Sequence, residues 1–333
     1  MMPREDIMEA IFEDGLELLD DLTVKMNNPK RTYILGPNVF RGKKIRLAGG
    51  YVGGIWNDNL FEGIIGNILP SGTVENDIIT IKALPVDLLK DDWRVKRSFT
   101  PYSVYDRYSD VIREVVSRYH PQYKIQIDDS PTVPGVIGPI QHDETDIQFC
   151  RRMAKEAGGW EFFIKANTVY FRKPNTFGAP QITYKHGHNI ETYSLQIDDA
   201  IMKASLRYYT GGAGDNKTEP ESGEASIEEM RYSQEGRAGD SERASDIRRE
   251  DYLLFAGIDP QLADMIIRGE LSGPASLEQI LTINAPGDPR IISGTMATVK
   301  DMGWMDGNWY QRKIIHTFSG DRYKMNVELT NHV

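Results

Sequence analysis

Histidine and carboxylate clusters are the first places to look for chemistry in this chain. His186 and His188 flank one glycine, and on a strand that spacing puts both imidazoles on one side, so a metal site is conceivable. Spacing assigns no third ligand, and an exposed strand end is therefore the preferred interpretation. Carboxylates in the first turn of a helix complement its dipole, so we interpret a second cluster as structural. That cluster comprises His142, Asp143, Glu144 and Asp146.

The remaining motifs with possible chemistry are weak. The glycine run at 49–54 lacks the Gly-Lys-Ser/Thr ending of a phosphate loop, and a bend or bulge in a strand explains it better. The chain has no nucleophile elbow and no His-Glu-x-x-His, and spacing pairs no two carboxylates as a glycosidase acid and base. We therefore predict no catalytic, cofactor-binding or metal-binding residue and no cofactor.

Composition narrows the class of protein further. The 333 residues suffice for roughly two or three compact units. The formal net charge of -10 argues against specific nucleic-acid binding, which needs a positive surface. No apolar run approaches the ~20 residues of a membrane span, and we expect no secretory signal in the opening residues. The single Cys150 excludes an intrachain disulfide and is interpreted as a buried, inert thiol in a protein folded in a reducing cytoplasm.

The stretch 143–173 predicts the element around which the chain is organised, a helix followed by a hairpin. Thr145 can cap the helix, with Gln148 as the other half of a capping box. Gly158 and Gly159 stop the helix. Apolar residues then alternate with polar ones in two short strands around a turn at 166–167. The helical face is marked by the spacing of Ile147, Phe149, Cys150, Met153, Ala154 and Ala157.

The flanking sequence predicts mainly β structure. Short β-branched and aromatic runs fill 21–97, and they return from Gln181 to the C-terminus. A helix ends before Pro121, with its start left open between N-caps at Thr100, Ser103 and Ser109. The strand Tyr123–Asp128 follows that helix, and a largely helical stretch is expected at 251–271. The residues before position 21 fit a short amphipathic helix or an edge strand.

The predicted fold class is α+β, mainly β, with two barrel-like β domains flanking or surrounding a small α+β domain. The first β domain covers 1–98, the α+β domain covers 99–174, and the second β domain covers 175–333. A polar insertion at 211–247 is interpreted as a mobile loop or as a segment that orders on a partner. Packing within the β domains is the first interpretation, and a ligand platform the second, for Trp56, Trp93, Trp160, Trp304 and Trp309.

A faint internal repeat links the two β blocks. KIRLAGGYVGGIWNDNLFEGIIGNI followed by DIITIKAL matches TMATVKDMGWMDGNWYQRKIIHTF followed by YKMNVELT in its order of strands, glycines, tryptophans and Ile-Ile pairs. Duplication and chance are equal alternatives, because β-hairpins share composition.

The order of these elements resembles a known family. TDIQFCRRMAKEAGGWEFFIKANTVYFRKP is similar to the signature of the phage late control gene D family, the baseplate hub proteins of contractile tails. GTMATVKDMG with WYQRKIIHTFSGDRYKMNVELT resembles the ending of that family, and KIRLAGGYVGG with LFEGII resembles its early barrel hairpin. The similarity spans most of the chain, which departs from the family pattern at 211–244.

This resemblance implies a homotrimer that is similar to the upper part of the type VI secretion spike. Two related barrels per chain would form a quasi-sixfold ring matching the hexameric tail tube. The implied partners are the tail tube protein and the central spike protein, with tape measure protein and other baseplate proteins as further ones. The implied location is the virion baseplate, assembled in the host cytoplasm, and an acidic channel would let DNA pass without sticking. We expect the trimer interface among exposed β edges of the two blocks.

Two alternatives stay open beside a structural, non-enzymatic hub. One is a tail-associated hydrolase acting on peptidoglycan or glycan, although the hub-like pattern leaves no spare lysozyme-sized unit. The other is the hub of a phage-derived tailocin or injection system, which no residue of the chain distinguishes from a phage virion.

Overall fold

The computed structural model of the chain describes residues 6–16, 20–28, 33, 41–72, 77–85, 94–99, 105–133, 138–165, 167–174, 179–197, 204–211, 221–226, 249–256 and 279–330. Within these ranges the structure is α+β and mainly β, which confirms the predicted fold class. None of the helices within these ranges is long and apolar enough to cross a membrane.

The first β block forms a five-stranded unit, here called unit 1, with the strand order β1-β2-β5-β4-β3. Its inward-facing residues alternate along each strand, as Leu22, Val24 and Met26 do on β2. Residues 7–15 form β1, which is paired with β2 on one side and β18 on the other, so both the helix and the edge strand expected for this stretch are wrong there. The strands are β1 (Ile7–Gly15), β2 (Asp21–Asn27), β3 (Lys44–Gly50), β4 (Trp56–Gly72) and β5 (Asp77–Pro85).

The second β block forms a matching unit, here called unit 2, with the strand order β12-β16-β19-β18-β17. One more strand, β11, pairs in parallel with β17 at the edge of this unit. The strands are β11 (Ile182–Lys185), β12 (Thr192–Ile197), β16 (Gln279–Pro286), β17 (Thr295–Lys300), β18 (Gly307–Ser319) and β19 (Arg322–Thr330).

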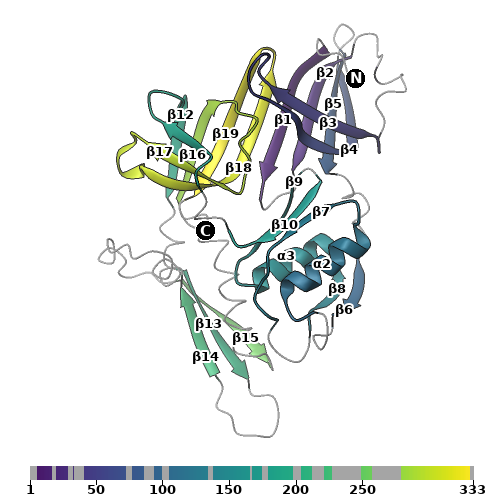
Figure 1. Cartoon of the computed structure of the whole chain (residues 1–333), viewed down its shortest axis with the longest axis vertical. Coiled ribbons are helices and arrows are strands. Elements are labelled where there is room, and N and C mark those ends of the chain that lie inside the picture. Colours follow the sequence, from purple (N-terminus) through teal and green to yellow (C-terminus); the bar gives the residue numbers. More distant parts are fainter. Residues whose placement is uncertain are drawn as a thin grey trace.

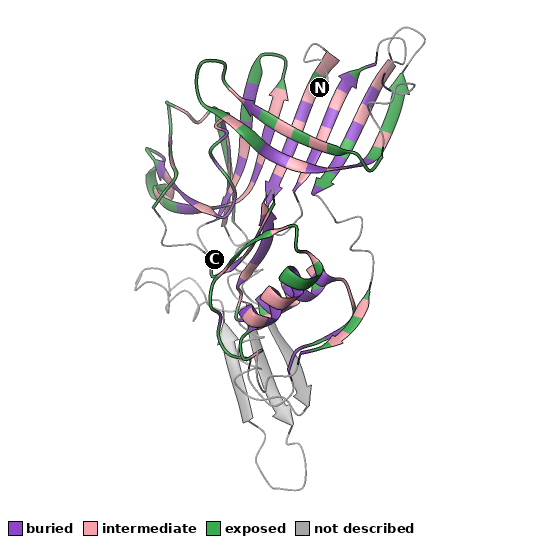
Figure 2. Cartoon of the chain, turned by 45° about the vertical axis from the view of Figure 1, so that its right-hand side comes forward, coloured by how far each residue is buried: buried purple, intermediate pink, exposed green. Residues whose placement is uncertain are grey.

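The two units join into one 11-stranded sheet at the top of Figure 1, where β18 pairs antiparallel with β1. Each unit keeps its own hydrophobic cluster, one around Phe61 and Ile81 and the other around Tyr184 and Ile314. Figure 2 shows the alternation of buried and exposed residues along these strands. Strand pairing closes neither unit into a barrel within the described ranges, and the domain boundaries at 98 and 174 stay predictions.

An α+β unit lies below the large sheet, with its small sheet between the helices and unit 1 (Figure 1). The small sheet has the order β7-β10-β9, in which β10 is parallel to β7 and antiparallel to β9. A separate two-stranded sheet pairs β6 with β8. The elements are β6 (Val95–Ser98), α2 (Tyr108–Tyr119), β7 (Lys124–Ile127), β8 (Ile140–Glu144), α3 (Asp146–Glu156), β9 (Glu161–Lys165) and β10 (Thr168–Arg172).

Local signals set the limits of both helices. The predicted capping box of α3 is confirmed, with Gln148 N–H donating to the Thr145 hydroxyl at 3.2 Å and Thr145 N–H donating to the Gln148 side chain at 3.0 Å. Helix α2 begins after Arg107, which differs from all three predicted caps. Ser109 instead lies inside the helix, where its N–H donates to the Ser130 hydroxyl at 2.8 Å. The start of α2 is instead held locally by Asp110, whose side chain accepts from the Arg107 N–H at 3.1 Å.

Two sequence predictions in the C-terminal half are corrected. Residues 251–256 belong to the strand β15 (Arg249–Ala256) and not to a helix, because they pair in parallel with β13 (Ala204–Gly211). Residues 257–271 lie outside the described ranges. Within the predicted insertion at 211–247, β14 (Glu221–Ser226) is a strand that pairs with β13, so a loop is wrong for that part. Apart from these strand residues, 212–247 lies outside the described ranges.

Units 1 and 2 repeat each other in strand order and in the register of their paired strands. The same bulge interrupts both sheets, between Ile65 and Asn67 in β4 and between Gln311 and Lys313 in β18. Next to each bulge a glycine with positive φ donates its N–H at 2.7 Å, Gly42 to the Ile65 carbonyl and Gly294 to the Gln311 carbonyl. These independent landmarks place Ile65 and Gln311 at the same position of the fold.

The same register holds along the outer strands. Asn28 N–H donates to the Asp77 carbonyl at 2.8 Å, and Gly287 N–H donates to the Tyr323 carbonyl at 2.9 Å. Leu22 of β2 and Leu281 of β16 occupy equivalent positions in the two units. Leu22 pairs with Phe12 of β1, and Leu281 pairs with Leu195 of β12, so Phe12 and Leu195 are equivalent as well. The chain therefore contains a duplicated five-stranded unit. In this register the Ile314-Ile315 pair corresponds to Ile68-Leu69 and not to Ile64-Ile65.

Candidate functional site

The two histidines lie at an exposed strand end, as the preferred interpretation had it. His186 and His188 are in the turn directly after β11, which ends at Lys185, and not within a strand that would place both imidazoles on one side. The His186 ring packs edge-on against Tyr193, with the ring centroids 5.8 Å apart. Within the described ranges no group of three histidine, cysteine, aspartate or glutamate side chains could hold a metal ion.

The glycine run at 49–54 forms a bulge and a hairpin tip, as predicted. The β3–β4 register shifts between Leu47 and Gly49. Gly50 has φ +147°, and a Cβ there would lie 2.2 Å from the Ile55 carbonyl oxygen, so the tight turn requires glycine. The tip carries apolar side chains into solvent, among them Val52, which is 84% exposed.

The tryptophans divide into two groups. Trp160 and Trp309 are buried, which confirms their packing role. Trp56 and Trp304 are 51% and 69% exposed, so core packing is wrong for both. Trp56 is the first residue of β4, and Trp304 lies in the connection between β17 and β18. Trp93 lies outside the described ranges.

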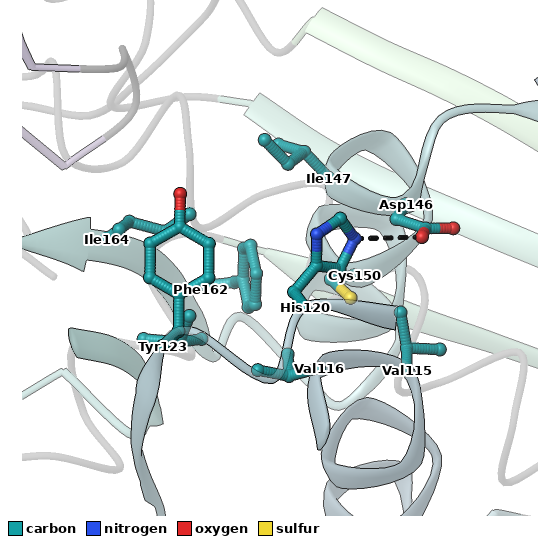
Figure 3. A pocket seen from close by; sticks show the side chains of 10 residues that line it. Val115, Val116, His120, Tyr123, Asp146, Ile147, Cys150, Phe162 and Ile164 are labelled. Carbon is teal, nitrogen blue, oxygen red and sulfur yellow. Dashed lines mark hydrogen bonds and ion pairs between the residues drawn. The ribbon is translucent and has the colours of Figure 1, made fainter. Parts of the chain in front are cut away.

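One small pocket opens between α2, α3 and the hairpin (Figure 3). Asp146, the first residue of α3, accepts from three elements: Arg97 at 2.7 Å, Gln141 at 2.8 Å and His120 Nε2 at 2.9 Å. Burial alone would raise the pKa of Asp146, but the hydrogen bonds of His120 and Gln141 and the charge of Arg97 hold it below its ordinary value. The Asp146 carboxylate is therefore charged, and it holds the three elements together at the rim of the pocket.

The geometry of this pocket does not favour catalysis. Its cavity volume is about 20 Å³, which is room for little more than one water molecule. Cys150 lines the pocket, but the His120 ring nitrogen not bonded to Asp146 lies on the far side of the ring from the Cys150 sulfur (Figure 3). The predicted carboxylate cluster before α3 thus acts structurally, through more contacts than the helix dipole.

A second polar cluster joins the α+β unit to unit 1. The Lys165 ammonium at the end of β9 contacts Asp14, donates to Asp20 at 2.9 Å and donates to the Gly15 carbonyl at 3.0 Å. Asp14 also accepts from the Ser293 N–H and hydroxyl, both at 2.8 Å. Both carboxylates are buried, at 1% and 3% exposure. This lysine cluster therefore ties β9, β1 and the β16–β17 loop together.

The two buried carboxylates that contact the Lys165 ammonium, Asp14 and Asp20, have pKa values shifted in opposite directions. Burial would raise the pKa of Asp14, but Lys165 and the Ser293 hydrogen bond lower it below its ordinary value. Burial raises the pKa of Asp20 to about 7, Lys165 opposes that rise, and the negative Asp14 reinforces it. Burial would lower the pKa of Lys165, yet the two carboxylates raise it. Lysine thus stays charged while Asp20 titrates near neutral pH.

A third polar cluster completes the same junction. The Tyr310 hydroxyl of β18 donates to Glu161 of β9 at 2.6 Å. Arg172 of β10 donates to the Gly294 carbonyl at 2.5 Å, and its Nε lies 3.6 Å from Glu161. Burial raises the pKa of Glu161, and the Tyr310 hydrogen bond and Arg172 oppose that rise. The outer face of the hairpin is thereby fixed against both units.

Sequence reasoning missed this junction, although the sequence carries one signal for it. In the strand EFFIK, Phe162 and Ile164 face the helices, while Phe163 points the other way and is only 4% exposed. An aromatic residue on the face assigned to solvent indicates that a second layer covers that face. The identity of that layer depends on strands more than 140 residues away, which spacing does not reveal.

Comparison with solved structures relates this architecture to tail proteins. The tail protein from Neisseria meningitidis MC58 superposes with a TM-score of 0.68 at 11% identity, covering 98% of this chain and 92% of that one. The chain shares the fold of that tail protein. The 43 kDa tail protein of prophage MuSo2 from Shewanella oneidensis gives a TM-score of 0.65 at 12% identity, covering 97% and 94% of the two chains.

A secretion protein has the same fold. The Escherichia coli protein c3393, a component of the type VI secretion system described as similar in structure to the T4 phage tail proteins gp27 and gp5, gives a TM-score of 0.60 at 9% identity, covering 98% of this chain and 74% of that one. No protein-family model matches the sequence, and no curated protein matches it by sequence. The structural neighbours are thus phage tail proteins and type VI secretion proteins, as the sequence resemblance leads one to expect.

Proposed function

We propose that this chain is a structural baseplate hub protein of a contractile tail. In this proposal three copies form an adaptor between the tail tube and the central spike, around a channel for tape measure protein and DNA. The observation that carries it is the duplicated five-stranded unit on a tail-protein fold. Two equivalent units per chain let a threefold assembly present six similar surfaces to a hexameric tube.

The arrangement of the α+β unit supports a static role. Three polar contacts made by Lys165, Glu161 and Arg172 fix the hairpin against the large sheet. A part that transmits load between a tube and a spike needs such fixed junctions. The net charge of -10 suits a channel through which a polyanion passes.

Light scattering on the purified chain, alone and with its candidate spike protein, tests the hub assignment. We expect a trimer, or a complex with three copies of this chain per spike. A chain that stays monomeric and ignores both spike and tube protein contradicts the proposal.

A cell-wall turbidity assay tests the proposed absence of catalysis. The proposal predicts unchanged turbidity when purified chain is added to peptidoglycan. Clear lysis would favour the hydrolase alternative, and the acidic residues would then be searched by substitution.

A further inference from the structure

Strands β1 and β12 occupy the same place in the two units but differ in exposure. On β1, Ala10 and Phe12 are each 3% exposed. On β12, Tyr193 corresponds to Ala10 and is 47% exposed, and Ile197 corresponds to Asp14 and is 46% exposed. Leu195, between them on the same face, is half-buried. The face of β12 that repeats the buried face of β1 is therefore apolar and open.

The burial of β1 comes from its pairing with β18. β17 pairs with the first part of β18, as far as Gln311, and β1 pairs with the rest of that edge from Lys313 onward. The Phe12 ring then lies between Phe61 of unit 1 and His316 of unit 2, with centroid distances of 5.6 and 5.5 Å. One strand of unit 1 thus completes the open edge of unit 2.

Unit 1 has the same edge, and none of the described strands completes it. β3 pairs with β4 as far as Ile65, whose N–H donates to the Lys43 carbonyl at 2.9 Å. Beyond that point, no residue in the described ranges pairs with 67–72 on this edge. These residues correspond to 313–318 of β18, the part that pairs with β1. Leu69 on this segment is 51% exposed.

We propose that β12 of one chain pairs antiparallel with residues 67–72 of β4 in a second copy, in the register that β1 and β18 use within the chain. The inference rests on the proposed trimeric hub and names the surface that builds it. Three copies then alternate three internal junctions with three intermolecular ones, and six β units close into a ring. The register opposes Tyr193 to Gly72, Ser194 to Ser71, Leu195 to Pro70, Gln196 to Leu69 and Ile197 to Ile68.

Side-chain chemistry at the two kinds of junction corresponds. In the internal junction the Lys313 ammonium lies 2.8 Å from the Glu13 carboxylate. The equivalent residues of the intermolecular junction are Asn67 and Gln196, two amides that can hydrogen-bond to each other. An ion pair in the internal junction is thus matched by a pair of neutral amides in the intermolecular one, and neither junction contains an unpaired charge at this position.

Pro70 sets the character of the proposed junction. Proline has no N–H, so its pair with Leu195 can form at most one hydrogen bond. A proline on an open edge disfavours pairing with an arbitrary strand. The open edge therefore selects a strand that also brings an apolar row, as β12 does with Tyr193, Leu195 and Ile197.

Paired cysteines test the register. Ser71→Cys combined with Ser194→Cys puts two small residues opposite each other across the junction, at the positions of Thr317 and Ile11 in the internal one. Under a mild oxidant in the assembled protein, we expect a disulfide between chains and a denaturing-gel band of three chains. The internal control is Ile11→Cys with Thr317→Cys, which should link without a change of mass.

A second control places the cysteines out of register. Ser194→Cys with Asn67→Cys separates the two residues by several positions along the strand, beyond the roughly 7 Å that a disulfide spans. This pair should not link, and neither should either single variant, because the native Cys150 is buried. Cross-linking of the out-of-register pair as efficient as that of Ser71 and Ser194 would overturn the proposed register.

A charge variant tests the apolar row independently of disulfide formation. Tyr193→Lys with Ile197→Lys should convert the trimer to monomers at concentrations where the unchanged chain is fully trimeric, with the midpoint of monomer unfolding unaltered. Ile125→Lys, at a side chain 39% exposed in the α+β unit, should leave the trimer intact. A double-lysine variant that still forms trimers would overturn the inference.

The outcomes separate this inference from the proposed function. A trimer by light scattering that yields no Ser71–Ser194 cross-link would overturn the β12 junction and leave the hub assignment standing. A chain that forms no trimer, alone or with spike and tube proteins, would overturn both.

Discussion

The two β units share a backbone plan and differ in what covers their first strand. In unit 1, β1 is enclosed by β2 and β18, and its inward residues are Ala10 and Phe12. In unit 2, β12 pairs with β16 and with no other strand of the described ranges, and its matching residues are Tyr193 and Leu195. The backbone arrangement of the first strand is the same in both units. The side chains differ because β1 is covered by a strand of the same chain, whereas we propose that β12 is covered by a strand of a second copy.

The ends of these strands also differ. Asp14 at the end of β1 lies in the lysine cluster, whereas Ile197 holds the same position on β12. The α+β unit follows unit 1 in the chain and docks at the junction of both units through Lys165 and Tyr310. The same position of the repeat is therefore a polar contact to the α+β unit in unit 1 and an exposed apolar residue in unit 2.

Alanine substitutions in the first strand of each unit should have the largest and most different effects. Phe12→Ala removes a ring packed between Phe61 and His316, and we expect the free energy of unfolding to fall by about 3–5 kcal/mol. Leu195→Ala should change monomer stability by no more than about 1 kcal/mol and should weaken association instead. Urea unfolding and light scattering measure the two effects, and equal losses of monomer stability would contradict the assignment.

Removing the lysine of the cluster should have the next largest effect. Lys165→Met leaves two buried carboxylates without a counter-charge, and we expect a loss of at least about 3 kcal/mol at pH 8. Combining it with Asp20→Asn should recover part of that loss, because one uncompensated charge is gone. Additive losses in the double variant would argue against the coupling.

The paired glycines offer a matched test of the repeat. Gly42 and Gly294 have φ +86° and +80°, so alanine should cost about 1–2 kcal/mol at either position. A Cβ at Gly42 meets nothing within 4 Å, but at Gly294 it would lie 2.7 Å from Arg172 Nη2. Gly294→Ala should therefore lower the melting temperature more than Gly42→Ala does. The reverse order would show that the Arg172 contact is not rigid.

The pH dependence of stability should reveal Asp20. Because its pKa is raised from 3.8 to about 7, the folded chain holds a proton between about pH 4 and pH 7 that the unfolded chain has lost. The free energy of unfolding that this proton contributes is complete below about pH 4, falls steadily as the pH rises, and is lost above about pH 7. As the pH rises across this window, the free energy of unfolding of the Asp20→Asn variant should increase relative to that of the unchanged chain by up to about 1 kcal/mol per pH unit. Parallel pH profiles of the two proteins would contradict this titration.

The smallest expected effect concerns the ion pair of the internal junction. Glu13 and Lys313 are 36% and 24% exposed, so Glu13→Gln should cost under about 1 kcal/mol in urea unfolding. The variant copies the amide found at Gln196 in unit 2. A loss of several kcal/mol would mean that the two junctions are not chemically interchangeable.

The elements that depend on neighbouring residues could be predicted from the sequence, whereas those that depend on pairing between distant strands could not. The Thr145 cap, the Gly158-Gly159 stop and the hairpin were predictable because their partners lie within a few residues. The central place of β1 was not, because its partner β18 lies about 300 residues along the chain. β15 was mistaken for a helix because a short apolar run fits either structure until its partner strand is known.

The candidate sites followed the same rule. The sequence indicated the Asp146 region but not its partners His120 and Arg97, which come from other elements. Lys165 resembled an ordinary exposed lysine of a strand, since its acidic partners lie about 145 residues earlier. The duplication was visible only as a pattern of glycines and aromatic residues, and strand register was needed to align it.

Hydrogen–deuterium exchange of 9–14 and 192–197, in the free chain and in the assembled protein, shows whether β12 gains a pairing partner on assembly. In the free chain we expect slow exchange in β1 and fast exchange in β12, whose outer amides face solvent. On assembly β12 should become protected to a degree similar to β1, together with 68–72 of β4. Exchange in β12 that stays fast in a fully assembled trimer would contradict the pairing of β12 with β4 of a second copy.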